Sequence, residues 1–114
     1  MTRFKIIPSY LFIGLSALHT IVGFVTHDSL TENALWFFSA GMALFYVGAI
    51  NLIQIKYPSE SLIRRLTILS NLIMTFFVLA FGAYTFQRNV GNLMAWLLIV
   101  NAVAALVISA GKRT

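Results

Sequence analysis

The chain has no cysteine, and it has only three acidic residues and two prolines among its 114 residues. Without cysteine it can form no disulfide, no thiol redox centre and no cysteine-ligated metal site of its own. Charged residues make up 10% of the chain, whereas hydrophobic residues make up 60%. A soluble domain of this size needs far more charge on its water-facing surface. The composition therefore excludes a soluble domain and indicates a membrane protein.

Four long apolar stretches account for most of the sequence, and the mean hydropathy of the chain is +0.89. They run roughly over residues 6–26, 34–55, 62–86 and 92–110. Each is close to the ~20 residues that a helix needs to cross ~30 Å of hydrocarbon. The connections between them are too short for anything but antiparallel neighbours. The sequence thus predicts an all-α, integral membrane, four-helix up-down-up-down bundle that forms a single domain over residues 1–114.

The basic residues are distributed unevenly along these stretches. Seven of the eight fall in segments that would share one side of the membrane: Arg3, Lys5, Lys56, Arg64, Arg65, Lys112 and Arg113. Arg88 is the single exception. By the positive-inside rule, both termini are then cytoplasmic and the protein is a multi-pass protein of the inner membrane. Because apolar spans separate these basic residues, we expect no binding of nucleic acid.

Polar residues recur at helical spacing and mark the inward faces of the spans, since small and polar side chains hold helices together in lipid. The predicted polar core consists of Ser16, Asn51, Asn71, Thr75 and Asn101. Asn71 and Asn101 fall at similar depth near the midplane, and Asn51 lies nearer the cytoplasm. Such amides could satisfy one another and fix the register of the helices, or they could line a pocket for a polar head group.

His19 is the leading candidate for a functional residue, because an ionisable side chain inside a span needs a partner or a wet cavity. Its ring could bond Ser39, Tyr84 or a backbone carbonyl, or it could contact a ligand. We predict an outer-half pocket formed by His19, Trp36, Ser39, Tyr84 and Trp96. The other histidine, His27, is about two turns further out, so no metal or haem site is expected. No other cofactor is expected either.

Two segments carry a resemblance to known proteins. They are Leu18-His19-Thr20-Ile21-Val22-Gly23, and Trp36-Phe37-Phe38-Ser39-Ala40-Gly41 followed by Gly48. The chain resembles small bacterial four-helix membrane proteins that have a Leu-His-x-x-x-Gly first helix and an aromatic second helix with spaced glycines. More distantly, it resembles the DoxX-like group, some of whose members are linked to quinone or redox partners. The resemblance implies no particular reaction, but it draws attention to His19 and Trp36.

Three functions are compatible with these features. The leading hypothesis is a non-enzymatic protein of the lipid bilayer that binds a small hydrophobic or amphipathic ligand, or a lipid, in the outer-half pocket. The second is an accessory or structural subunit that acts through helix packing, within a homo-oligomer or against another protein. The third is a small transporter or channel, which would require a homo-oligomer. Enzymatic activity has the least support, because the sequence shows no nucleophile-base pair, carboxylate dyad or metal-ligand cluster.

Overall fold

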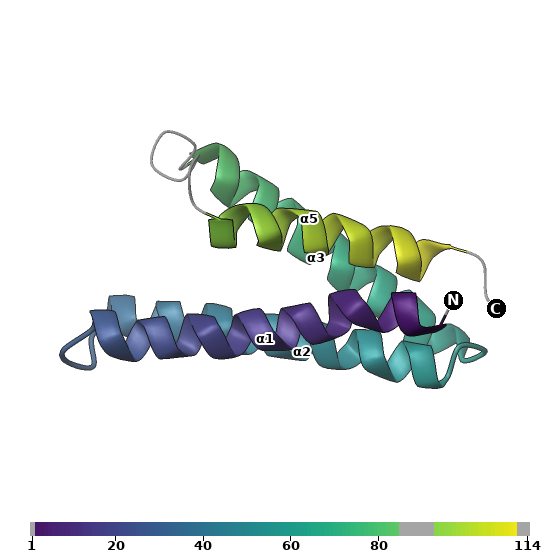
Figure 1. Ribbon diagram of the computed structural model, residues 1–114, viewed down its shortest axis with the longest axis horizontal. Coiled ribbons are helices and arrows are strands. Elements are labelled where there is room, and N and C mark those ends of the chain that lie inside the picture. The colour runs from purple at the N-terminus through teal and green to yellow at the C-terminus, as the bar shows by residue number, and fades with distance from the viewer. Residues whose placement is uncertain (1, 85–92, 112–114) are drawn as a thin grey trace.

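The protein is all-α, as predicted, and the part of the chain that the structure describes contains four helices (Figure 1). The computed structural model describes residues 2–84 and 93–111, with the backbone alone for Thr2, Arg3 and Met94. The helices are α1 (Thr2–Thr26), α2 (Glu32–Lys56), α3 (Ser61–Tyr84) and α5 (Leu93–Ala110). Three of them, α1, α2 and α3, are long and apolar enough to cross a membrane, and α5 is a shorter apolar helix. The chain is therefore a multi-pass membrane protein.

The helix ends follow local chemistry rather than hydropathy. Helix α1 begins at Thr2, four residues before the predicted apolar stretch, because a helix continues beyond the hydrocarbon where backbone groups can still pair. Thr31 caps α2, accepting a hydrogen bond from the Ala34 N–H at 3.2 Å. The Tyr57 N–H closes the last turn of α2 on Ile53 O, and Pro58 then prevents the helix from continuing. Residues 85, 86, 88, 92, 112 and 113, which the predicted spans and charge pattern include, lie outside the described residues.

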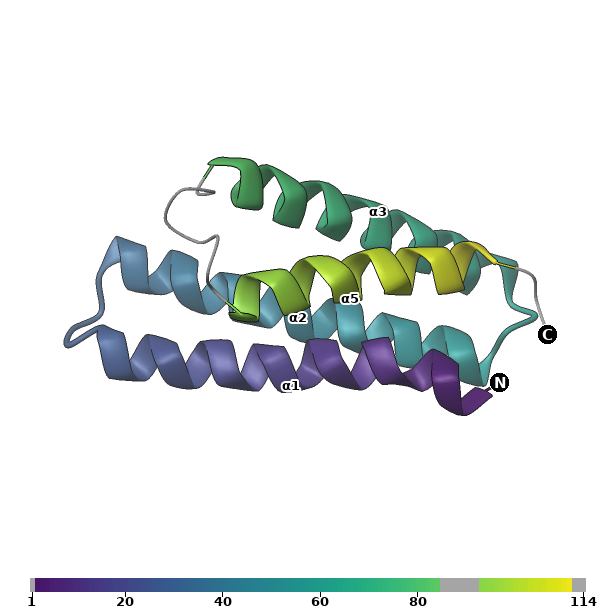
Figure 2. The same cartoon turned by 45° about the horizontal axis from the view of Figure 1, so that its top comes forward.

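Consecutive helices are antiparallel and form two hairpins, α1 with α2 and α3 with α5 (Figures 1 and 2). A seam of small, buried residues joins the first hairpin, and these recur every seven residues on each helix: Ser9, Ser16 and Gly23 on α1, and Ala34, Gly41 and Gly48 on α2. The two backbones approach closely along it, since a Cβ placed on Gly48 would lie 2.8 Å from Ser9 O. Close approach gives the helices dispersion contacts that lipid cannot replace.

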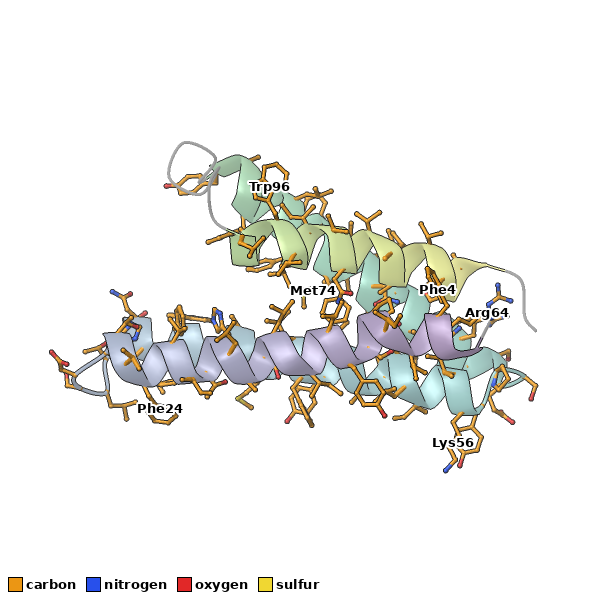
Figure 3. All side chains as sticks on the ribbon, in the orientation of Figure 1. Phe4, Phe24, Lys56, Arg64, Met74 and Trp96 are labelled. Atoms are coloured by element: carbon orange, nitrogen blue, oxygen red, sulfur yellow. The ribbon has the colours of Figure 1, made fainter. Side chains whose placement is uncertain are left out.

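The two hairpins meet at one end and diverge at the other. We call the end with Thr2, the 57–60 connection and Gly111 the proximal end, and the end with the 27–31 connection the distal end. At the proximal end α5 lies against α1, and the two hairpins separate toward the distal end (Figures 1 and 2). The hydrophobic core joins all four helices and consists of Phe12, Leu44, Met74, Val78, Ala102 and Ala105. Met74 lies between the hairpins (Figure 3).

Burial along the inward faces follows this divergence. On α1, Phe12 is 0% exposed, whereas His19, two turns further toward the distal end on the same face, is half-buried. On α3, the exposure rises from 3% at Val78 to 51% at Phe81. The faces that are covered in the proximal half are thus partly uncovered in the distal half. His19 lies on α1 between the covered and uncovered parts.

Candidate functional site

His19 lies half-buried on α1 against Phe37 of α2. Its Nε2 lies 3.0 Å from the carbonyl oxygen of Phe37. The imidazole also stacks on the Phe37 ring, with centroids 3.9 Å apart and planes 9° from parallel. A carbonyl oxygen can only accept, so Nε2 carries the proton and donates it. Of the three partners considered for this ring, the structure has the backbone carbonyl.

This hydrogen bond fixes what the other nitrogen of His19 can do. When Nε2 carries the proton of a neutral imidazole, Nδ1 has a lone pair and can only accept. The described part of the chain supplies no donor to Nδ1. The opposite edge of the ring faces α2, where Cδ2 lies 3.5 Å from a Cβ placed on Gly41. His19 therefore presents an unused acceptor at a depth where water is scarce, and leaving such a group unpaired in hydrocarbon is costly.

His27 lies on the same aromatic ring, further toward the distal end. Its ring centroid is 5.4 Å from that of Phe37, with the planes tilted by 50°. Its Nδ1 lies 3.0 Å from the carbonyl oxygen of Gly23, to which it donates. The two histidines thus carry their protons on different nitrogens. Within the described residues no group of three or more His, Cys, Asp or Glu could hold a metal ion.

The other four residues of the predicted pocket are exposed, and the hydrogen bonds of Trp36 and Ser39 lie within α2. Trp36 is 67% exposed, and its indole N–H lies 3.4 Å from Glu32 Oε1. Ser39 is exposed and donates to the Trp36 carbonyl of its own helix at 2.7 Å. Tyr84, the last residue of α3, is 85% exposed. Trp96 of α5 is 45% exposed (Figure 3). The residue that the structure adds to the site is Phe37.

Sequence reasoning missed Phe37 because the helix rotations were unknown. Phe37 and Phe38 are adjacent and equally aromatic, and each lies one turn from Ala34 and Gly41, on opposite flanks of the seam. Only the packing of α1 on α2 decides that Phe37 is the ring on the side of His19. The backbone carbonyl of Phe37, which accepts the hydrogen bond from His19, cannot be predicted from sequence, because every residue has a backbone carbonyl.

The predicted polar core forms a hydrogen-bonded cluster in the proximal half. Asn51 and Asn71 form a reciprocal amide pair, with N···O distances of 2.8 and 2.9 Å. Asn71 Nδ2 also lies 3.2 Å from Ala105 O and 3.0 Å from Ser109 Oγ, so it joins α3 to α5. The Asn51 amide nitrogen also donates to Val47 O of its own helix at 2.8 Å. This cluster, which we call the amide cluster, connects three helices through buried side chains.

The remaining polar-core residues make separate bonds. Asn101 donates to the Pro8 carbonyl at 2.9 Å and so ties α5 to α1 across the two hairpins. Thr75 donates to Ala102 O at 3.3 Å. Ser16 donates to Ile13 O of its own helix at 2.7 Å. All five residues are buried, and each donates a hydrogen bond to a protein acceptor. Among the described residues, Ser9 Oγ is a buried side-chain atom without a hydrogen-bond partner, and His19 uses one of its two ring nitrogens.

The fold and these contacts define a class: a small, multi-pass, α-helical membrane protein with a hydrogen-bonded polar core and a half-buried histidine that uses one of its two ring nitrogens. Comparison of the chain with protein-family models, with curated proteins and with solved structures finds no match. The resemblance to small DoxX-like proteins therefore stays a prediction.

Proposed function

We propose that the protein is an inner-membrane bundle whose proximal end, including both termini, faces the cytoplasm. The described basic residues support this orientation, since Lys5, Lys56, Arg64 and Arg65 all belong to the proximal end. Arg64 also donates to the carbonyls of Ala110 and Gly111, at 3.2 and 2.6 Å, at the carboxyl end of α5. There it satisfies acceptors that the helix leaves open and complements the helix dipole.

Within this bundle, the proposed function is the binding of a small amphipathic molecule at His19. The observation that carries this proposal is the free acceptor at Nδ1 of a ring that its other nitrogen holds in place. The matching ligand has a hydroxyl or N–H donor attached to an apolar body. Its donor would pair with Nδ1, and its body would lie against the apolar side chains where the hairpins diverge.

Depth favours a ligand over bulk water at this position. His19 lies seven residues inside the distal end of α1 at Thr26, which corresponds to ~10 Å at ~1.5 Å per residue. Val22, which is 36% exposed, provides apolar surface nearer the distal end. An amphipathic molecule from the outer leaflet could reach this level with its apolar part in hydrocarbon throughout. Trp36, Ser39, Tyr84 and Trp96 remain proposed pocket residues only if the helices or side chains move when the ligand binds.

The second candidate is an accessory subunit that acts through helix packing. One observation favours it specifically: the five polar-core residues have protein acceptors for their donors without any ligand, as structural polar groups should. The amide cluster would then make the proximal half a rigid support. A transporter or channel remains the third candidate, and it would need several copies of the chain to provide a path.

Native mass spectrometry of the gently solubilised full chain tests the ligand proposal. His19→Gln is the informative variant, because its side-chain amide can still donate to Phe37 O but has no acceptor in the place of Nδ1. His27→Gln is the matched control at the rim. We expect a co-purifying small molecule in the wild-type and His27→Gln proteins, and its loss from His19→Gln. The same bound mass in His19→Gln, or none in the wild type, would overturn the proposal.

A further inference from the structure

Tyr46 has an unusual place for a tyrosine in a membrane protein. It is ten residues from Lys56 and fourteen from Glu32, the two ends of α2, so it lies ~15 Å from the proximal end and near the middle of the span. The side chain is 61% exposed. Tyrosine normally lies at the membrane interface, where its hydroxyl remains wet. A hydroxyl at mid-depth needs a partner, and no described residue supplies a hydrogen bond to it.

Tyr46 stands beside a groove on the surface of the first hairpin. The groove has a volume of about 420 Å³ and lies between α1 and α2. It is lined by Ser16, Ala17, Thr20, Ile21, Gly41, Met42, Phe45 and Tyr46. The small residues Gly41 and Ala17 create this recess. The rings of Phe45 and Tyr46 project beside it and lie edge to face, with their centroids 5.8 Å apart. Cavity and projection are therefore neighbours on one surface.

The polar atoms of the groove offer acceptors but no free donors. Ser16 Oγ donates to Ile13 O at 2.7 Å, and Thr20 Oγ1 donates to Ser16 O at 2.9 Å. The proton of each hydroxyl is already engaged in a hydrogen bond, so each oxygen can take part in a further hydrogen bond only as an acceptor. The Tyr46 hydroxyl supplies the complementary group, a donor without an acceptor. A lipid tail would fill the volume but would leave this phenol unpaired.

We propose that this groove and its Tyr46 rim are the contact surface for a second copy of the chain. A two-fold interface requires a surface that is complementary to itself, with a projection and a recess that exchange between copies. Phe45 and Tyr46 of one copy would enter the groove of the other, and each Tyr46 O–H would donate to a hydroxyl acceptor of the facing groove. The phenol would then be satisfied at mid-membrane depth. This surface adjoins the proposed ligand site at Gly41, but its donor and acceptors, Tyr46, Ser16 and Thr20, are not part of that site.

Cysteine crosslinking of the full chain in phospholipid vesicles tests the interface, since the natural sequence has no background thiol. Met42→Cys places a thiol in the groove, and Ile73→Cys is the control on α3, 61% exposed and near mid-span. We expect oxidation to give disulfide-linked dimers of Met42→Cys and not of Ile73→Cys. Equal crosslinking at both positions, or none at Met42→Cys, would overturn the proposal.

The role of the phenol is tested by measuring dimerisation on dilution in vesicles, with Förster transfer between labelled copies. Interhelical side-chain hydrogen bonds in membranes are modest, so Tyr46→Phe should weaken the dimer about 3-fold to 10-fold. Tyr10→Phe, near the proximal end, should leave it unchanged. Ala17→Leu, which fills the groove, should abolish association. A dimer that tolerates Ala17→Leu, or a groove thiol that reacts only with a different membrane protein, would contradict a second copy as the occupant.

Discussion

Replacing Asn71 by leucine removes the centre of the amide cluster while nearly keeping the side-chain volume. Asn71 is 0% exposed and contacts α2 and α5 through its amide. Its two N–H protons serve three acceptors, so at least one proton is shared. The substitution should loosen both helix pairs in the proximal half and leave the seam of the first hairpin intact.

The magnitude follows from the bonds lost. Interhelical side-chain bonds in membrane proteins average ~0.6 kcal/mol and reach ~1.7 kcal/mol, so the contacts to Asn51, Ala105 and Ser109 together contribute ~2–3 kcal/mol. Asn51 Oδ1 then loses its donor in a buried position, which adds ~1 kcal/mol or more. The free energy of unfolding should fall by ~3–4 kcal/mol. Asn51→Leu added to Asn71→Leu should cost less than the sum of the two single substitutions, because the orphaned amide is gone.

Reversible unfolding in bicelles, followed by steric trapping, measures this difference. Thr75→Val is the matched control in the same helix, since it removes a single interhelical bond of 3.3 Å and should cost ~0.6 kcal/mol. If Asn71→Leu were no more destabilising than Thr75→Val, the amide cluster would not be the tie between α2, α3 and α5.

Two further predictions concern the seam and the end of α5. Gly48→Ala should destabilise the protein by ~1–3 kcal/mol, because its Cβ would lie 2.8 Å from the backbone oxygen of Ser9. Gly14→Ala is the control: nothing lies within 4 Å of its Cβ, so it should be neutral or stabilising by up to ~1 kcal/mol. Equal effects of the two substitutions in unfolding measurements would contradict close packing along the seam. Arg64→Gln should speed hydrogen exchange in the last turn of α5 severalfold, because it removes the guanidinium that donates to Ala110 O and Gly111 O. Unchanged exchange there would show that this contact is not formed in the membrane.

Much of the architecture could be read from the sequence, because the hydrocarbon core imposes simple requirements on length and polarity. Four apolar stretches with short connections predict four antiparallel helices, and the structure confirms the all-α fold. The start of α1 at Thr2 was missed, since hydropathy marks the part of a helix in lipid and not its hydrogen-bonded end. The separation of the hairpins was also missed, because sequence periodicity gives faces and not angles between helix pairs.

The site was predictable only in part, and the reason is rotation about the helix axes. His19 stands out in any apolar span, so its position was found from sequence. Its partner depends on which α2 residue lies on the flank of the seam, and Phe37 differs from Trp36 by only 100° around the helix. Asn51 and Asn71 pair directly, whereas Asn101, at similar predicted depth, bonds Pro8 instead. Depth is encoded by position along a span, but pairing depends on packing.

The central claim is that His19 uses Nε2 to hold α1 to α2 and presents Nδ1 as a free acceptor for a ligand. The imidazole ¹⁵N spectrum of histidine-labelled protein in native-lipid bilayers tests this most directly, with His27→Gln assigning the two histidines. The account predicts a neutral His19 ring protonated at Nε2, and an Nδ1 resonance that moves on adding the co-purified small molecule to stripped protein. A proton on Nδ1, or an Nδ1 resonance that the added molecule leaves unchanged, would contradict it.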